Sequence, residues 1–177
     1  MRTVLLDRDG VVTINRKYNV KSPAELCLIP GAAKAIARLN RSGVAVALCT
    51  NQPEVDKGIV DKRELDAIHR ALRIMLARRH ARLDLILCCT DDFRSDWRKP
   101  SSGMLFEAMR HLGAKPADTP FVGDQVSDLE AAAHAHCQPV LVRTGLGWAT
   151  ETACIPQYAK PVAIYNDLAA FADSYCC

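Results

Sequence analysis

Short apolar runs alternate along the chain with longer segments in which apolar residues recur every three to four positions. The short runs are almost continuously apolar, as is typical of strands buried on both faces of a parallel sheet. We expect strands at residues 3–6, 44–49, 83–89, 119–123, 139–144 and 162–165. The helical spacing, with Gly43 and Gly113 as stop signals, predicts helices at residues 31–43, 61–80, 102–113, 127–136 and 167–175.

This alternation of strands and helices predicts an α/β fold: a three-layer, Rossmann-like parallel sheet with helices on both faces. The pattern shows no internal repeat, no linker and no large cap domain, so residues 1–177 are expected to form a single domain. The segment 11–30 is long for a connection between a first strand and its helix, and long connections of this kind often shape a pocket.

Composition narrows the class of protein. With 49% hydrophobic residues the chain can bury a full core, and a net charge of +3 is too balanced to favour nucleic-acid binding. The basic run 77–82 is interpreted as the solvated end of a helix. No apolar stretch is long enough for a membrane span, and the N-terminus lacks a signal-peptide pattern. We therefore expect a cytoplasmic protein whose eight cysteines are reduced.

Polar side chains follow four of the predicted strands, directly after three of them and after a longer loop in the case of the third strand. Singly, each group is an ordinary turn or helix cap. Together they would meet at one edge of a parallel sheet, where ligands of such folds bind. The residues are Asp7 and Asp9 after the first strand, Thr50, Asn51 and Gln52 after the second, Arg98 and Lys99 after the third, and Asp124 and Asp128 after the fourth.

The chemistry of these groups indicates phosphoryl transfer. Clustered carboxylates such as Asp7, Asp9 and Asp124 suit Mg²⁺, a hard cation that prefers oxygen ligands. Lys99 and the Thr50 hydroxyl can hold the oxygens of a transferring phosphoryl group. One carboxylate can act as nucleophile, and a second can protonate the leaving oxygen and later activate water.

Four motifs in this order, DRDG at 7–10, CTN at 49–51, RKP at 98–100 and GDQVSD at 123–128, resemble those of the haloacid dehalogenase superfamily. The resemblance implies that Asp7 is the nucleophile and that Asp9 is the general acid/base. It further implies that Thr50 and Lys99 stabilise the phosphoryl group. Mg²⁺ would be held by Asp7, the backbone carbonyl of Asp9, and Asp124, with Asp128 supporting them from behind.

A finer resemblance is to subfamily IIIA, the branch of D-glycero-D-manno-heptose 1,7-bisphosphate 7-phosphatases and histidinol-phosphate phosphatases. The stretches LDRDGVV, TNQPEVDKG, RKPSSGML and VLVRTGLG carry it. The resemblance implies a protein that dephosphorylates a small phosphorylated sugar in nucleotide-activated heptose biosynthesis, which serves lipopolysaccharide. We expect this protein to be a monomer. It also implies substrate contacts from Arg98, from Asn51 and Gln52 beside the phosphate, and from Arg16, Lys17 and Tyr18 beside the sugar.

One departure from the branch concerns zinc. Its members commonly hold a structural zinc ion through a C-x-H pair and a C-x-C pair before RKP. Aligned on RKP, the corresponding residues are Cys88, Thr90, Ser95 and Trp97. One thiolate cannot replace four ligands, so no zinc is expected, and Trp97 packing is expected to hold the loop.

Three alternatives stay open at this stage. A signalling receiver domain uses a similar set of residues, but its phosphorylated aspartate ends the third strand, whereas here the acid pair follows the first. A binding module without activity is disfavoured because all the motif residues are present. A phosphatase of histidinol phosphate, of another small sugar phosphate or of a nucleotide is the strongest alternative.

Overall fold

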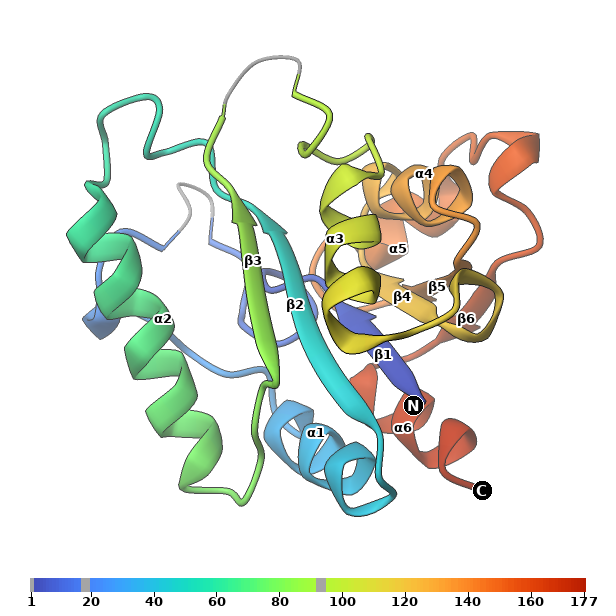
Figure 1. The fold of residues 1–177 in the computed structure, drawn as a ribbon, viewed down its shortest axis with the longest axis horizontal. Coiled ribbons are helices and arrows are strands. Elements are labelled where there is room, and N and C mark those ends of the chain that lie inside the picture. Colours follow the sequence, from blue (N-terminus) through green and yellow to red (C-terminus); the bar gives the residue numbers. More distant parts are fainter. Residues whose placement is uncertain (1, 17–19, 92–94) are drawn as a thin grey trace.

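Six parallel strands form one sheet in the order β3-β2-β1-β4-β5-β6 (Figure 1). The structure is a computed structural model, and it describes residues 2–16, 20–91 and 95–177. The strands are β1 (Thr3–Leu6), β2 (Ala45–Asn51), β3 (Leu85–Cys89), β4 (Pro120–Gly123), β5 (Gln138–Val142) and β6 (Ala163–Tyr165). The parallel sheet predicted from the apolar runs is confirmed.

Helices cover both faces of this sheet, which gives three layers. One face carries α1, α2 and α6, and the other carries α3 and α4. In Figure 1, α1 and α2 lie on one side of β2 and β3, and α3 lies on the other side. The helices are α1 (Ala32–Arg41), α2 (Lys62–Ala77), α3 (Gly103–Leu112), α4 (Val126–His134), α5 (Gly147–Thr152) and α6 (Leu168–Tyr175).

The two faces have separate cores because successive strand residues point to opposite sides. On β1, Val4 and Leu6 belong to the cluster under α1, α2 and α6, whereas Leu5 belongs to the cluster under α3 and α4. All three are fully buried. Burial on both faces is the reason that these strands are apolar throughout rather than alternating.

Several predicted boundaries were wrong by a few residues. Strand β2 continues to Asn51, so Thr50 and Asn51 are part of the strand rather than of the turn after it. Helix α2 ends at Ala77, and His80 has a left-handed φ of 58° that prevents the helix from continuing. The basic run therefore lies mostly beyond the helix. The short helix α5 was not predicted, and within the described residues no helix has both the length and the apolarity that a membrane span requires.

The order of the strands decides where the polar groups meet. Strand β1 lies at the centre of the sheet, between β2 and β4. Strands β2 and β3 lie on one side of it, and β4, β5 and β6 lie on the other side. In such sheets ligands bind at the carboxyl ends of the strands, at the point where the strand order reverses. The residues that follow β1, β2 and β4 are therefore brought together.

Candidate active site

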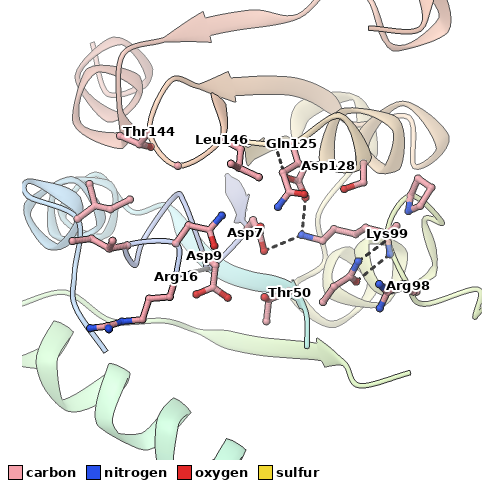
Figure 2. Close-up of a pocket in the computed structure, with 17 residues that line it drawn as sticks. Asp7, Asp9, Arg16, Thr50, Arg98, Lys99, Gln125, Asp128, Thr144 and Leu146 are labelled. Atoms are coloured by element: carbon pink, nitrogen blue, oxygen red, sulfur yellow. Dashed lines mark hydrogen bonds and ion pairs between the residues drawn. The ribbon is translucent and has the colours of Figure 1, made fainter. Parts of the chain in front are cut away.

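A pocket of about 1030 Å³ opens at the carboxyl ends of the central strands (Figure 2). Residues from the four sequence motifs line it, and so do residues of the long segment after β1, as that segment's length suggested. The predicted site residues in its lining are Asp7, Asp9, Arg16, Thr50, Asn51, Arg98, Lys99 and Asp128.

Lys99 joins two acids at the base of the pocket. Its Nζ lies 2.8 Å from Asp7 Oδ1 and 2.6 Å from Asp128 Oδ1, and all three side chains are buried. Burial by itself would lower the pKa of Lys99, but the carboxylates of Asp128 and Asp7 raise it above its ordinary value. Lys99 is therefore a fixed positive charge beside Asp7.

Asp7, Asp124 and Asp128 form an acidic cluster in which one oxygen of each lies within 4.8 Å of the others. Burial raises the pKa of Asp124 to about 8, and the neighbouring Asp128 and Asp7 carboxylates add to this effect. Burial likewise raises the pKa of Asp7 to about 6, although Lys99 opposes the rise. These raised pKa values mean that Lys99 does not fully offset the negative charge of the three carboxylates.

The orphaned oxygen atoms show where a cation fits. Asp124 Oδ1 is buried, and among the described residues nothing donates a hydrogen bond to it. Asp128 is different, because Oδ1 faces Lys99 and Oδ2 accepts from the backbone N–H groups of Asp124 and Gln125. Asp7 and Asp124 are therefore the side chains suited to Mg²⁺, whereas Asp128 contacts Lys99 and the backbone of Asp124 behind them.

Two glycines leave room for Asp124. Gly10 has a φ of 89° and Gly145 a φ of 59°, and a Cβ atom on either would collide with Asp124 Oδ2. That oxygen accepts a hydrogen bond from Leu146 N at 2.8 Å. The turns after β1 and β5 thus close on the carboxylate and fix its direction.

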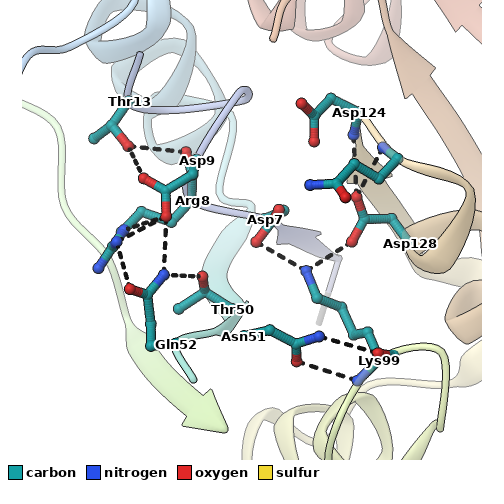
Figure 3. A network of polar contacts seen from close by, with 11 residues as sticks. Asp7, Arg8, Asp9, Thr13, Thr50, Asn51, Gln52, Lys99, Asp124 and Asp128 are labelled. Carbon is teal, nitrogen blue, oxygen red and sulfur yellow. Dashed lines mark hydrogen bonds and ion pairs between the residues drawn. The ribbon is translucent and has the colours of Figure 1, made fainter. Parts of the chain in front are cut away.

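Asp9 belongs to a second network on the other side of Asp7 (Figure 3). Its Oδ1 accepts from the Thr13 hydroxyl at 2.9 Å. Its Oδ2 accepts from Arg8 Nη2 at 2.7 Å and from Gln52 Nε2 at 2.9 Å. Burial would raise the pKa of Asp9, but the Arg8 guanidinium and these hydrogen bonds hold that pKa below its ordinary value. Asp9 is therefore ionised in this arrangement at neutral pH.

Asn51 holds the RKP segment in place. Its Nδ2 donates to Lys99 O at 3.0 Å, and Lys99 N donates back to Asn51 Oδ1 at 3.1 Å. Trp97 is 38% exposed and lies close to Gly103, and its role in securing this loop stays a prediction. The Asn51 bridge and the hydrogen bond from Gly103 N to Asp96 O also hold the loop.

Three predicted contact residues need comment. Gln52 is 3% exposed and lies behind Thr50 and Asp9 instead of lining the pocket. Lys17 and Tyr18 lie outside the described residues.

In the part of the chain that the structure describes, the acidic cluster is the one group of at least three His, Cys, Asp or Glu side chains close enough together to hold a metal ion. The absence of zinc stays a prediction, because the loop that would hold it includes residues 92–94.

Several residues of the site were missed from the sequence. Gln125, Ser127, Thr144 and Leu146 also line the pocket, and Arg8 is buried beside Asp9. Its place between two acids, Asp7 and Asp9, was the available signal for Arg8. Nothing in the sequence showed that the turn after β5 would reach β1.

Comparison with known proteins agrees with this arrangement of fold and site. Residues 96–171 match the family model for HAD-hydrolase-like proteins. The chain is 39% identical to D-glycero-beta-D-manno-heptose-1,7-bisphosphate 7-phosphatase of Pseudomonas aeruginosa, with 97% of this chain and 96% of the relative covered. It is also 39% identical to the Bordetella bronchiseptica protein of the same name, with 98% and 97% covered.

A solved structure shows the same likeness in three dimensions. The crystal structure of D,D-heptose 1,7-bisphosphate phosphatase from B. bronchiseptica, complexed with magnesium and phosphate, superposes with a TM-score of 0.93. Sequence identity is 38%, and 99% of this chain and 98% of that one are covered. The protein is a phosphatase of the haloacid dehalogenase class. Within that class, it belongs to the family of heptose-1,7-bisphosphate 7-phosphatases.

Proposed function

We propose that this protein is a Mg²⁺-dependent phosphatase that removes the 7-phosphate of D-glycero-D-manno-heptose 1,7-bisphosphate through an aspartyl-phosphate on Asp7. The observation that carries the proposal is the position of Asp7, buried in the pocket base with Lys99 Nζ 2.8 Å from one of its oxygens. The near full-length identity to phosphatases of this substrate supports the choice of sugar.

In the first step an Asp7 oxygen attacks phosphorus, and the bond from phosphorus to the sugar oxygen breaks. Asp9, which is ionised in the substrate-free site, first takes up the proton of a monoanionic phosphate ester and then gives it to the leaving oxygen. The sugar departs as an alcohol and the phosphoryl group stays on Asp7. Lys99 and the Thr50 hydroxyl offset charge on the phosphoryl oxygens. Lys99 also favours the ionised form of Asp7, the form that can attack.

In the second step Asp9 accepts a proton from water, and the water oxygen attacks phosphorus. The bond between phosphorus and Asp7 breaks, inorganic phosphate leaves, and Asp7 is restored. The ionised state of Asp9 is the state that this step requires. Because Asp9 serves both steps, it must lie close to the phosphoryl group on Asp7, and its position two residues further along the chain places it there.

The residues present fit Mg²⁺. Asp7 and Asp124, with the backbone carbonyl of Asp9, would hold the ion, since Asp124 Oδ1 is buried without a hydrogen-bond donor among the described residues and an Asp7 oxygen lies in the same cluster. When bound, Mg²⁺ supplies positive charge that offsets the acidic cluster and the incoming phosphate.

Substrate recognition would come from the rim of the pocket. Arg16 and Arg98 line it from opposite segments and supply positive charge for a second phosphate or a sugar hydroxyl. Asn51 would act by holding Lys99 and its neighbour Arg98 in position. The proposed activity places the protein in nucleotide-activated heptose biosynthesis in the cytoplasm.

Release of inorganic phosphate from a panel of substrates tests the proposal. The panel contains both anomers of heptose 1,7-bisphosphate, fructose 1,6-bisphosphate, histidinol phosphate and common nucleotides, each with Mg²⁺ and with EDTA. We expect kcat/KM to be highest for a heptose bisphosphate and activity to disappear in EDTA. A preference for histidinol phosphate or a nucleotide would contradict the substrate but not the mechanism.

A further inference from the structure

Arg8 is a fully buried cation beside the site, and the mechanism above does not use it. It is the largest side chain in the fully buried core. Its Nε and Nη2 donate to Asp9 Oδ2 at 3.1 and 2.7 Å, and Nη2 also donates to Gln52 Oε1 at 2.7 Å. A buried guanidinium is costly unless it is well paired, so this cluster has a strongly preferred arrangement.

The contact with Arg8 decides which way the Gln52 amide points. Arginine has donors and no acceptor, so the Gln52 atom that faces it must be the carbonyl oxygen. The amide NH₂ group is then directed to the other side. There Gln52 Nε2 lies 2.9 Å from Asp9 Oδ2 and 3.0 Å from Thr50 Oγ1, and it donates to both.

The consequence reaches the Thr50 hydroxyl. Because its oxygen accepts from Gln52, the single hydroxyl proton is left to be donated elsewhere. Among the described residues no acceptor for that proton is found, and Thr50 lines the pocket. The proton is therefore available to an oxygen of a phosphoryl group bound there.

We infer that Arg8 and Gln52 are positioning residues: Arg8 sets the direction of the Gln52 amide, and Gln52 commits the Thr50 hydroxyl proton to the phosphoryl group. The same pair holds the Asp9 carboxylate. This inference rests on the proposed function. It assigns a task to Arg8, and it replaces the predicted phosphate contact of Gln52 with an indirect role through Thr50 and Asp9.

A double-mutant cycle tests the link from Gln52 to Thr50. Gln52→Met keeps the volume but removes the amide, and Thr50→Val removes the hydroxyl. The measured quantity is kcat/KM for an aryl phosphate, whose leaving group needs no proton, so the acid role of Asp9 does not enter. We expect Gln52→Met to lower kcat/KM about tenfold in the wild-type background and less than about twofold in the Thr50→Val background.

The link from Arg8 to Asp9 is tested by comparing leaving groups. Arg8→Lys keeps a positive charge but loses the two-point contact with Asp9. We expect kcat/KM for a sugar phosphate, which needs a proton on its leaving oxygen, to fall at least about tenfold more than kcat/KM for the aryl phosphate. If Arg8→Lys does not fold, Thr13→Val serves as the second variant. It removes a donor to Asp9 Oδ1 without touching the buried guanidinium, and it should change the same ratio.

Arg143 provides a matched control. Its Nε and Nη2 contact Glu151 at 2.6 and 2.8 Å and its Nη1 contacts Asn166 at 2.7 Å, a pattern like that of Arg8, but it does not line the pocket. Arg143→Lys should leave the ratio of the two kcat/KM values unchanged.

The outcomes separate the two proposals. Equal fold-losses from Gln52→Met in both backgrounds, or an unchanged substrate ratio in Arg8→Lys and Thr13→Val, would overturn the positioning roles while the wild type stays active. A wild type that releases no phosphate from either substrate with Mg²⁺ would contradict the proposed function itself.

Discussion

Two buried cations divide the acids of the site into separate pairs. Lys99 contacts Asp7 and Asp128, whereas Arg8 contacts Asp9. Burial raises the pKa of Asp7 to about 6 although Lys99 opposes the rise. Burial would also raise the pKa of Asp9, but the Arg8 guanidinium and the hydrogen bonds hold that pKa below its ordinary value. Two carboxylates two positions apart are thus made chemically different by their surroundings, which suits them to different roles.

At Asp7, replacement by asparagine should abolish turnover, because an amide cannot form the covalent intermediate. We expect kcat to fall by at least about 1000-fold on every substrate. Circular dichroism should show that the fold is retained, since the amide is nearly isosteric. Asp118→Asn, an exposed change outside the pocket, serves as the control and should keep full activity. Substantial activity in Asp7→Asn would show that another residue is the nucleophile.

His69 on α2 provides a prediction about acid stability. Burial lowers its pKa to about 4, and the nearby Arg8 adds to this effect. Between pH 6.5 and 4 the unfolded chain therefore binds more protons at this position than the folded chain, so the free energy of unfolding falls as the pH falls. The loss should reach roughly 2 to 3 kcal/mol at the acid end of this window.

The comparison of wild type with His69→Leu isolates this contribution. Among the described residues His69 Nε2 is buried without a hydrogen-bond partner, so leucine removes an unsatisfied group. Urea unfolding at pH 7 and pH 4.5 should show a smaller loss of stability in the variant. The same pH dependence in both proteins would assign the acid sensitivity to other groups.

At the level of elements, the site depends on turns that approach one another. The turn after β1 carries Gly10 and the turn after β5 carries Gly145, and both enclose Asp124 at the end of β4. Strands β1 and β4 are neighbours in the sheet, as are β4 and β5. Close approach at the carboxylate is possible only because both turns lack a Cβ atom there.

Gly145→Ala should therefore weaken Mg²⁺ binding, because the new methyl group displaces Asp124. Gly113→Ala is a matched control: its φ is 62° against 59° for Gly145, and its Cβ atom would meet nothing within 4 Å. Both changes should cost about 1 kcal/mol of stability from the left-handed backbone. Gly145→Ala should cost more than Gly113→Ala, because its Cβ atom would also lie 2.5 Å from Gly10 Cα. Only Gly145→Ala should raise the Mg²⁺ concentration needed for half-maximal activity, by about tenfold or more. Equal Mg²⁺ requirements in the two variants would remove the steric argument.

At the level of the whole molecule, the acidic cluster couples the metal to folding. In the metal-free protein the folded-state pKa of Asp124 is raised to about 8. The folded chain thus binds more protons there than the unfolded chain, and stability is lost as the pH rises toward 8. A bound cation removes this penalty and adds its own binding free energy.

We expect Mg²⁺ to raise the unfolding free energy by about 3 kcal/mol when its free concentration is a hundred times Kd. Thermal unfolding in EDTA should show stability falling between pH 6 and pH 8, and Mg²⁺ should suppress that fall. Asp124→Asn should show neither the fall nor the response to Mg²⁺. A full Mg²⁺ response in this variant would place the ion elsewhere. On the same samples, sedimentation tests the monomer prediction, and a single cooperative unfolding transition tests the single-domain prediction.

The sequence by itself determined the architecture and the chemistry of this protein. The continuous apolar runs required strands buried on both faces, and helical spacing between them required the covering layers. Asp7, Thr50 and Asp124 stood at predicted strand ends and Lys99 in the loop after the third strand, and parallel strands bring such ends to one edge. These inferences hold because they depend on local periodicity and on one rule of topology.

Only the tertiary structure decided how these groups are paired. Lys99 contacts Asp7 and Asp128, whereas the buried Arg8 guanidinium contacts Asp9. Gln52 lies behind Thr50. These pairings depend on the direction of each side chain. So does the approach of Gly145 to Asp124, which brings together segments far apart in the chain. Sequence spacing limits which segments can meet, but hydrogen-bond direction and close packing are settled only when all the strands and turns are in place.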